Sequence, residues 1–163
     1  MKAIAVVTGA AGGMGLATAR EFQLKGFEVI GVDQRPSGGN CNHFFQGDIC
    51  DEKLWMKVRD FIESEYGKLD TLINIAGRNY LSIIESADLD QWRNMFEVNV
   101  LGMVVSIKHL KNLLEKSDKP SIVNMSSISG YIGSVGYAAY CTTKGAVDSL
   151  TKSLALELAP KIR

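Results

Sequence analysis

A tyrosine and a lysine lie four positions apart in the stretch AAYCTTKGAV, residues 138–147. Residues at positions i and i+4 share one face of a helix, so Tyr140 and Lys144 would place a phenol beside an ammonium. A free phenol has a pKa of about 10 and stays protonated at neutral pH. A cation about 4 Å away stabilises the phenolate by about 4 kcal/mol, which corresponds to lowering the pKa of the phenol by about three units. The pair therefore has the residue types that transfer a proton to or from an alcohol oxygen.

Other polar residues could complete such a site. Ser126 and Ser127 end the apolar run PSIVNMSS, and a hydroxyl at the carboxyl end of a strand can donate to a developing alkoxide or carbonyl oxygen, although both serines could simply end the strand. Asn99 interrupts a helical pattern. The two histidines, His43 and His109, match no metal spacing, so no metal site is predicted.

A glycine-rich stretch, TGAAGGMG at residues 8–15, follows the first apolar run directly. Glycines let the backbone turn tightly and expose N–H groups to a pyrophosphate at a helix N-terminus, where the helix dipole favours negative charge. Their spacing is G-x-x-x-G-x-G rather than G-x-G-x-x-G, but the physical argument is the same. We expect a nucleotide-binding loop in which Gly9, Gly13, Met14 and Gly15 contact the cofactor.

Acidic residues end the next two predicted strands. Asp33 lies 18 residues beyond Gly15, close to the spacing expected for the acid that binds the adenosine ribose. Its carboxylate would repel a 2′-phosphate, which favours NAD over NADP, although Arg35 could instead meet a phosphate. Asp48 could accept a hydrogen bond from the adenine amino group or cap a helix, and Ile49 follows it at the same predicted cleft.

The elements that would position these residues alternate between short apolar strands and longer helical patterns. Strands that are apolar on both faces and separated by helices indicate a parallel sheet covered on both sides, so the fold class is α/β, a doubly wound, Rossmann-like sheet. Only nine residues separate Asp33 from His43, too few for a crossover helix, and a loop is predicted there. The predicted strands are 3–8, 27–33, 43–48, 69–77 and 120–127. One predicted helix follows the glycine-rich stretch and ends near residue 25, and three others span 52–66, 88–116 and 137–160.

Length and charge narrow the function. The 163 residues suit one domain, and 18 basic residues balance 18 acidic ones, so no net field favours a nucleic acid or an anionic membrane. The three cysteines show no disulfide or zinc spacing, and the apolar opening run is too short for a signal peptide or a membrane span, which favours the cytosol. A doubly wound nucleotide fold usually has at least about six strands, and five are predicted, so we expect that the sequence is a fragment. The final helix has an apolar stripe (Val147, Leu150, Leu154, Leu158) that needs a partner.

The motifs together resemble the short-chain dehydrogenase/reductase family. The resemblance covers Lys2 to Arg163 and rests on TGAAGGMG, NIAG at residues 74–77, Asn99 with Val100, the serine pair ending at Ser127, and Tyr140 with Lys144 in the pattern Y-x-x-x-K. Ile75 stands where the family has an asparagine, a departure that affects hydrogen bonding near the central sheet. Ser127, rather than Ser126, has the family's spacing to the tyrosine.

The resemblance implies NAD(P)-dependent hydride transfer with Asn99, Ser127, Tyr140 and Lys144 as catalytic residues, the asparagine holding a water that links the lysine to solvent. It also implies that Asn74, Ala76, Gly77, Tyr140 and Lys144 contact the cofactor. Family members continue into a further strand and a substrate loop, which are absent from these 163 residues. Helices 88–116 and 137–160 would pair across subunits in a homodimer or homotetramer.

The resulting prediction is an NAD-dependent oxidoreductase that interconverts a secondary alcohol and a ketone. The uncharged segment at residues 128–137 favours a hydrophobic or cyclic substrate, and the helix-free stretch after Asp33 is similar to family members that oxidise cyclic dihydrodiols. Arg78 could meet a carboxylate or face solvent. The alternatives are an NADP-dependent 3-oxoacyl thioester reductase and a non-catalytic nucleotide-binding or oligomerising protein.

Overall fold

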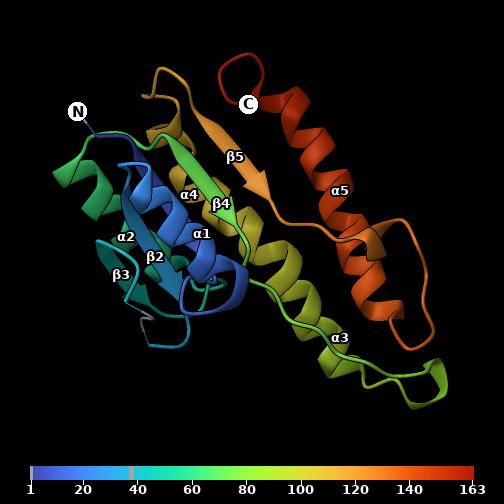
Figure 1. Ribbon diagram of the computed structural model, residues 1–163. Coiled ribbons are helices and arrows are strands. Elements are labelled where there is room, and N and C mark those ends of the chain that lie inside the picture. Colours follow the sequence, from blue (N-terminus) through green and yellow to red (C-terminus); the bar gives the residue numbers. More distant parts are fainter. Residues whose placement is uncertain (1, 37–38) are drawn as a thin grey trace.

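The computed structural model of the chain describes residues 2–36 and 39–163. Five parallel strands form one sheet in the order β3-β2-β1-β4-β5, with helices on both faces (Figure 1). This arrangement confirms the predicted doubly wound α/β fold. The strands are β1 (Ile4–Thr8), β2 (Glu28–Asp33), β3 (His43–Gln46), β4 (Thr71–Asn74) and β5 (Ser121–Asn124). The helices are α1 (Gly13–Leu24), α2 (Glu52–Glu65), α3 (Leu89–Phe96), α4 (Gly102–Leu114) and α5 (Ala138–Leu158), with short 3₁₀ turns at Ile84–Ser86 and Ile128–Gly130.

The central strand β1 is buried on both faces because successive side chains of a strand point in opposite directions. Val6 belongs to the apolar cluster on the α2 and α4 side, which contains Trp55 and Leu110. Val7 belongs to the cluster on the α1 side, which contains Ala19. Helices therefore cover both faces of the sheet, and its strands carry the continuous apolar runs seen in the sequence.

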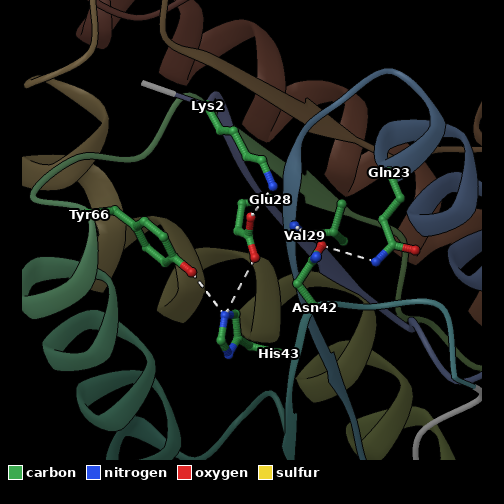
Figure 2. A network of polar contacts seen from close by, with 7 residues as sticks. All are labelled: Lys2, Gln23, Glu28, Val29, Asn42, His43 and Tyr66. Atoms are coloured by element: carbon green, nitrogen blue, oxygen red, sulfur yellow. Dashed lines mark hydrogen bonds and ion pairs between the residues drawn. The ribbon is translucent and has the colours of Figure 1, made fainter.

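The connection from β2 to β3 has no helix among its described residues, as the sequence predicts; Ser37 and Gly38 of that loop lie outside the described residues. Asn42 anchors the end of the loop. Its Oδ1 accepts hydrogen bonds from the backbone N–H of Val29 at 2.9 Å and from Nε2 of Gln23 at 3.0 Å (Figure 2). The side chain thus takes the place of a backbone acceptor next to β3.

A second polar contact secures the edge strand β3 to the end of α2. Figure 2 shows Nε2 of His43 between the hydroxyl of Tyr66, at 2.9 Å, and Oε1 of Glu28, at 3.6 Å. The other oxygen of Glu28 accepts from Nζ of Lys2 at 3.2 Å. Burial, helped by the charge of Glu28, raises the pKa of Tyr66, so the tyrosine stays a neutral hydrogen-bonding group.

The strands end earlier than their apolar runs suggest. The run at residues 69–77 gives a strand only over Thr71–Asn74, because the N–H groups of Ile75 and Ala76 donate to Oγ1 of Thr8, at 2.9 and 3.0 Å, instead of continuing the ladder. Thr8 thus supplies an acceptor beside Ile75, where the resemblance had left the hydrogen bonding open. The chain leaves the sheet here at its carboxyl edge, where the strand order reverses between β1 and β4.

The predicted helix over 88–116 is continuous but not uniform. Asp88 caps its start, with Oδ1 accepting from the N–H of Asp90 at 2.8 Å. A π-helical turn over Glu97–Leu101 separates α3 from α4 and contains Asn99, the residue that interrupts the sequence pattern. Within residues 2–36 and 39–163, none of the helices is long and apolar enough to cross a membrane.

The last helix, α5, runs beside β5 at the opposite end of the sheet from β3 (Figure 1). Val147 and Leu158 of its predicted apolar stripe are buried, and Leu154 packs with Ile122 of β5 against the larger cluster. The stripe thus finds at least part of its partner within this chain.

Candidate active site

A cleft of about 630 Å³ opens at the carboxyl edge of the sheet, at the point where the strand order reverses. Its walls come from the glycine loop, the end of β2, the turn after β3, the segment after β4 and the start of the π-helical turn. Open α/β sheets bind ligands at this point because the loops after neighbouring strands diverge there.

At two of its glycines, Gly9 and Gly15, the glycine loop has backbone atoms packed where a Cβ would lie. A Cβ on Gly9, whose φ is +72°, would lie 3.1 Å from backbone atoms of Ala76. A Cβ on Gly15 would lie 2.1 Å from the backbone oxygen of Gly9. Bare backbone therefore faces the cleft at the N-terminus of α1, which fits the pyrophosphate of a dinucleotide.

Asp33 is a buried carboxylate on the wall of this cleft, with 5% of its surface exposed. Its Oδ2 accepts the N–H of Ala11 at 3.0 Å, and its Oδ1 accepts the N–H of Arg35 at 2.9 Å and Nε of Arg35 at 3.4 Å. Burial by itself raises the pKa of Asp33, but these hydrogen bonds and the guanidinium charge outweigh burial and lower it. Asp33 is thus ionised at neutral pH, as recognition of a ribose diol requires.

Most of the predicted cofactor residues line the cleft: Gly9, Met14, Gly15, Asp33, Asp48, Ile49, Ala76 and Gly77. The other four predicted cofactor residues do not line the cleft as residues 2–36 and 39–163 form it: Gly13, Asn74, Tyr140 and Lys144. The amide of Asn74 is buried, donating to Oδ1 of Asn124 and accepting from the hydroxyl of Ser106, both at 2.9 Å. Oδ1 of Asp48 accepts the N–H of Cys50 at 2.9 Å, a turn contact, and the helix cap of α2 is Asp51.

Tyr140 and Lys144 lie one turn apart near the start of α5. Nζ of Lys144 lies 5.7 Å from the centre of the Tyr140 ring and donates to the carbonyl oxygen of Met125 at 2.7 Å. Only 3% of Lys144 is exposed, and burial lowers its pKa, an effect that the charge of Asp148 opposes. The ammonium is therefore fixed between the end of β5 and the phenol.

The structure distinguishes the two serines after β5. The hydroxyl of Ser126 donates to the carbonyl oxygen of Lys144 at 3.1 Å, which ties β5 to α5. Oγ of Ser127 accepts from the N–H of Ser129 at 3.2 Å and caps the 3₁₀ turn. Its hydroxyl hydrogen is not used in that bond, so Ser127 can still donate to a ligand.

Asn99 connects the segment after β4 with α5. Its Oδ1 accepts the N–H of Arg78 at 2.8 Å, and its Nδ2 donates to the carbonyl oxygen of Arg78 at 2.9 Å and to Oγ1 of Thr143 at 3.0 Å. Thr143 is fully buried, and its hydroxyl donates to the carbonyl oxygen of Tyr140 at 2.9 Å. The role of Thr143 was not predicted, although it lies inside the Y-x-x-x-K pattern. The proposed water-holding role of Asn99 stays a prediction.

Residues 3–163 match the sequence model of a protein family, short chain dehydrogenase. The chain belongs to the short-chain dehydrogenase family. It is 34% identical to cyclopentanol dehydrogenase of Comamonas testosteroni, with 96% of this chain and 67% of the relative covered. It is also 34% identical to the NADP-dependent (R)-specific alcohol dehydrogenase of Lentilactobacillus kefiri, with 97% of this chain and 67% of the relative covered.

A solved short-chain dehydrogenase structure is similar over almost all of this chain. The ligand-free aldohexose dehydrogenase of Thermoplasma acidophilum superimposes with a TM-score of 0.95 at 34% identity, covering 99% of this chain and 64% of that one. The chain thus spans about two thirds of the length of the relatives that it matches.

Proposed function

We propose that residues 1–163 carry both the dinucleotide cleft and the catalytic residues of an NAD-dependent oxidoreductase that interconverts a secondary alcohol and a ketone. The observation that carries the proposal is the buried ammonium of Lys144, 5.7 Å from the centre of the Tyr140 ring. A non-catalytic nucleotide-binding protein gains nothing from burying a lysine beside a phenol, because burying an ammonium costs free energy.

The residues divide the work of alcohol oxidation. A bound nicotinamide supplies the acceptor for the hydride that leaves the carbinol carbon. Tyr140 takes the hydroxyl proton as the C=O bond forms, and Lys144 stabilises the resulting phenolate. Ser127 donates to the same substrate oxygen, and Asn99 holds the segment after β4 against α5. In the reverse direction Tyr140 returns the proton to the ketone oxygen.

We propose NAD as the preferred cofactor. Asp33 is a buried, ionised carboxylate with hydrogen bonds to both oxygens, and it would repel a 2′-phosphate. The guanidinium of Arg35 lies against Asp33, which compensates its charge in part. The name of the Lentilactobacillus relative includes NADP, so the proposal of NAD rests on Asp33 itself and not on that relative.

We propose a hydrophobic, cyclic alcohol, including cyclic dihydrodiols, as the substrate. A backbone hydrogen bond of 3.1 Å from Ser82 to Gly136 joins two segments beside the N-terminal end of α5 (Figure 1). These segments expose seven large apolar side chains, with the charged Glu85 beside them, a composition that suits an apolar ring. The side chains are Leu81, Ile83, Ile84, Ile128, Tyr131, Ile132 and Val135. The name of the Comamonas relative, cyclopentanol dehydrogenase, also contains a cyclic alcohol.

We further propose a homodimer or homotetramer that pairs through α4 and α5. These helices expose apolar side chains, with Val104 37% and Leu156 84% exposed. Sedimentation at micromolar concentration should show the oligomer, and a monomer would contradict this proposal. A cytosolic location stays a prediction from the cysteine pattern; all three cysteines are free thiols.

Replacement of Tyr140 by phenylalanine tests the proposed chemistry. Reduction of NAD by a panel of cyclic secondary alcohols is followed by absorbance, and Tyr140→Phe should lose about 100-fold or more in kcat. Tyr137→Phe is the matched control, since its ring packs against that of Tyr140 with centroids 6.3 Å apart, but it has no proposed role in proton transfer. Turnover by Tyr140→Phe at the wild-type rate would refute the proposal.

A further inference from the structure

Arg78 lies on the wall of the cleft, directly after the NIAG segment. Its backbone is held on both sides by Asn99, which accepts its N–H at 2.8 Å and donates to its carbonyl oxygen at 2.9 Å. Asn99 is completely buried. The backbone of an otherwise exposed arginine is therefore fixed by a buried amide.

The guanidinium of Arg78 is also held, by two neutral side chains of α3. Nη1 donates to Oδ1 of Asn94, and Nη2 donates to Oε1 of Gln91 at 3.1 Å. Gln91 and Asn94 lie three residues apart on α3 and so share one helix face. Two amide acceptors orient the guanidinium but leave its charge uncompensated.

The other arginine on the cleft, Arg35, differs from Arg78 in having an anionic partner. The guanidinium of Arg35, also on the cleft, lies 3.4 Å from the carboxylate of Asp33. No carboxylate oxygen within residues 2–36 and 39–163 lies within 4.0 Å of the Arg78 guanidinium. Two of its N–H groups bind the amides, and the others are available to a ligand. Arg78 is thus an oriented cation on the cleft wall that has no anionic partner in the described protein.

We propose that Arg78 is an anion-binding residue of the cleft and that it takes a phosphate of the dinucleotide. A guanidinium already held in place loses little side-chain entropy on binding, and its planar geometry matches phosphate oxygens. Arg78 shares the cleft with the glycine loop and Asp33, whereas Tyr140 and Lys144 are not among its lining residues, which favours a cofactor phosphate over an anion on the substrate. This inference rests on the proposed function, since it assumes that the cleft binds a dinucleotide.

Gln91, Asn94 and Asn99 are then positioning residues for Arg78. Asn99 has a double effect, because its Nδ2 also donates to Thr143, next to Lys144. The phosphate-binding arginine and the catalytic helix are thereby joined through one buried side chain. Replacement of Asn94 by alanine should weaken phosphate binding less than loss of Arg78 itself.

Binding of cofactor fragments tests the inference without turnover. NADH is titrated by fluorescence, and ADP-ribose and adenosine are measured by displacement, for the wild type, Arg78→Gln and Arg78→Lys. Arg78→Gln should weaken ADP-ribose binding about tenfold or more and leave adenosine within about twofold, because a charge-assisted hydrogen bond to phosphate is lost. Arg78→Lys should recover part of the loss. Arg93→Gln, an exposed arginine of α3 that pairs with Asp90, is the matched control and should behave as the wild type.

The outcomes separate this inference from the proposed function. An unchanged ratio of ADP-ribose to adenosine affinity in Arg78→Gln would overturn the inference alone. A raised KM for alcohols that carry a carboxylate, with ADP-ribose binding intact, would reassign Arg78 to the substrate and overturn it as well. Failure of the wild-type protein to bind NADH would remove both.

Discussion

Replacing Lys144 by methionine removes a buried cation while keeping a side chain of similar length. Nζ of Lys144 lies 5.7 Å from the centre of the Tyr140 ring. At that distance and an effective dielectric constant of about 20, Coulomb's law gives about 3 kcal/mol between the ammonium and a negative charge on the ring. Loss of that stabilisation slows proton removal by a factor of about 100.

The assay is kcat for NAD reduction at saturating cofactor, measured from neutral to alkaline pH. Saturation separates this effect from any role of Lys144 in cofactor binding. The deficit should shrink as the pH rises, because burial lowers the pKa of Lys144 and the wild type then loses the same positive charge. Lys152→Met, the same change at an exposed lysine on the same helix, is the control, and thermal unfolding checks that the loss of the hydrogen bond to Met125 leaves the fold intact. A fall of less than about fivefold at neutral pH, or a deficit independent of pH, would refute the electrostatic reasoning.

Three further changes test other parts of the structure. Asp33→Asn should raise the affinity for NADPH relative to NADH by about tenfold, because a neutral amide no longer repels the 2′-phosphate; an unchanged ratio in fluorescence titrations would contradict this. Gly15→Ala should weaken NADH binding by more than about tenfold, since its Cβ would lie 2.1 Å from a backbone oxygen, whereas Gly133→Ala, with open space around it, should not. Burial raises the pKa of Asp70, but its hydrogen bonds outweigh burial and lower the pKa below 3.8, so this group adds stability that is lost as the pH falls through its folded-state value. Urea unfolding at neutral and acid pH should therefore show that the free energy of unfolding falls less on acidification for Asp70→Asn than for the wild type. An equal fall in both proteins would contradict this role of Asp70.

Features that depend on near neighbours in sequence were predictable. The i and i+4 spacing of Tyr140 and Lys144 is enough to put both on one helix face, and the structure has them one turn apart near the start of α5. The alternation of apolar runs and helical patterns predicted the parallel sheet, since strands buried on both faces have no polar period. The strand ends were less well predicted, because the apolar run continues through Ile75 into a loop whose N–H groups bind Thr8 instead of a neighbouring strand.

Features that depend on distant contacts were not predictable. A strand asparagine can face a ligand or a neighbouring helix, and Asn74 faces the buried Ser106 on α4. The guanidinium of Arg78 is bound by Gln91 and Asn94, 13 and 16 positions later in the chain. The sequence pattern does not predict where their helix lies relative to Arg78. Of the two serines after β5, Ser126 is the one that donates to the backbone of α5 at Lys144, 18 positions later in the chain.

The π-helical turn at Glu97–Leu101 is the geometric equivalent of one residue inserted into an α-helix. Each residue of an α-helix advances by about 100° around the axis, so a deletion that restored a regular helix would rotate α3 by about that angle relative to α4. Gln91 and Asn94 would then leave the side that meets Arg78, while the packing of α4 on α2 would keep its phase. The local winding of this one helix thus sets which amide groups of α3 meet the arginine on the cleft wall.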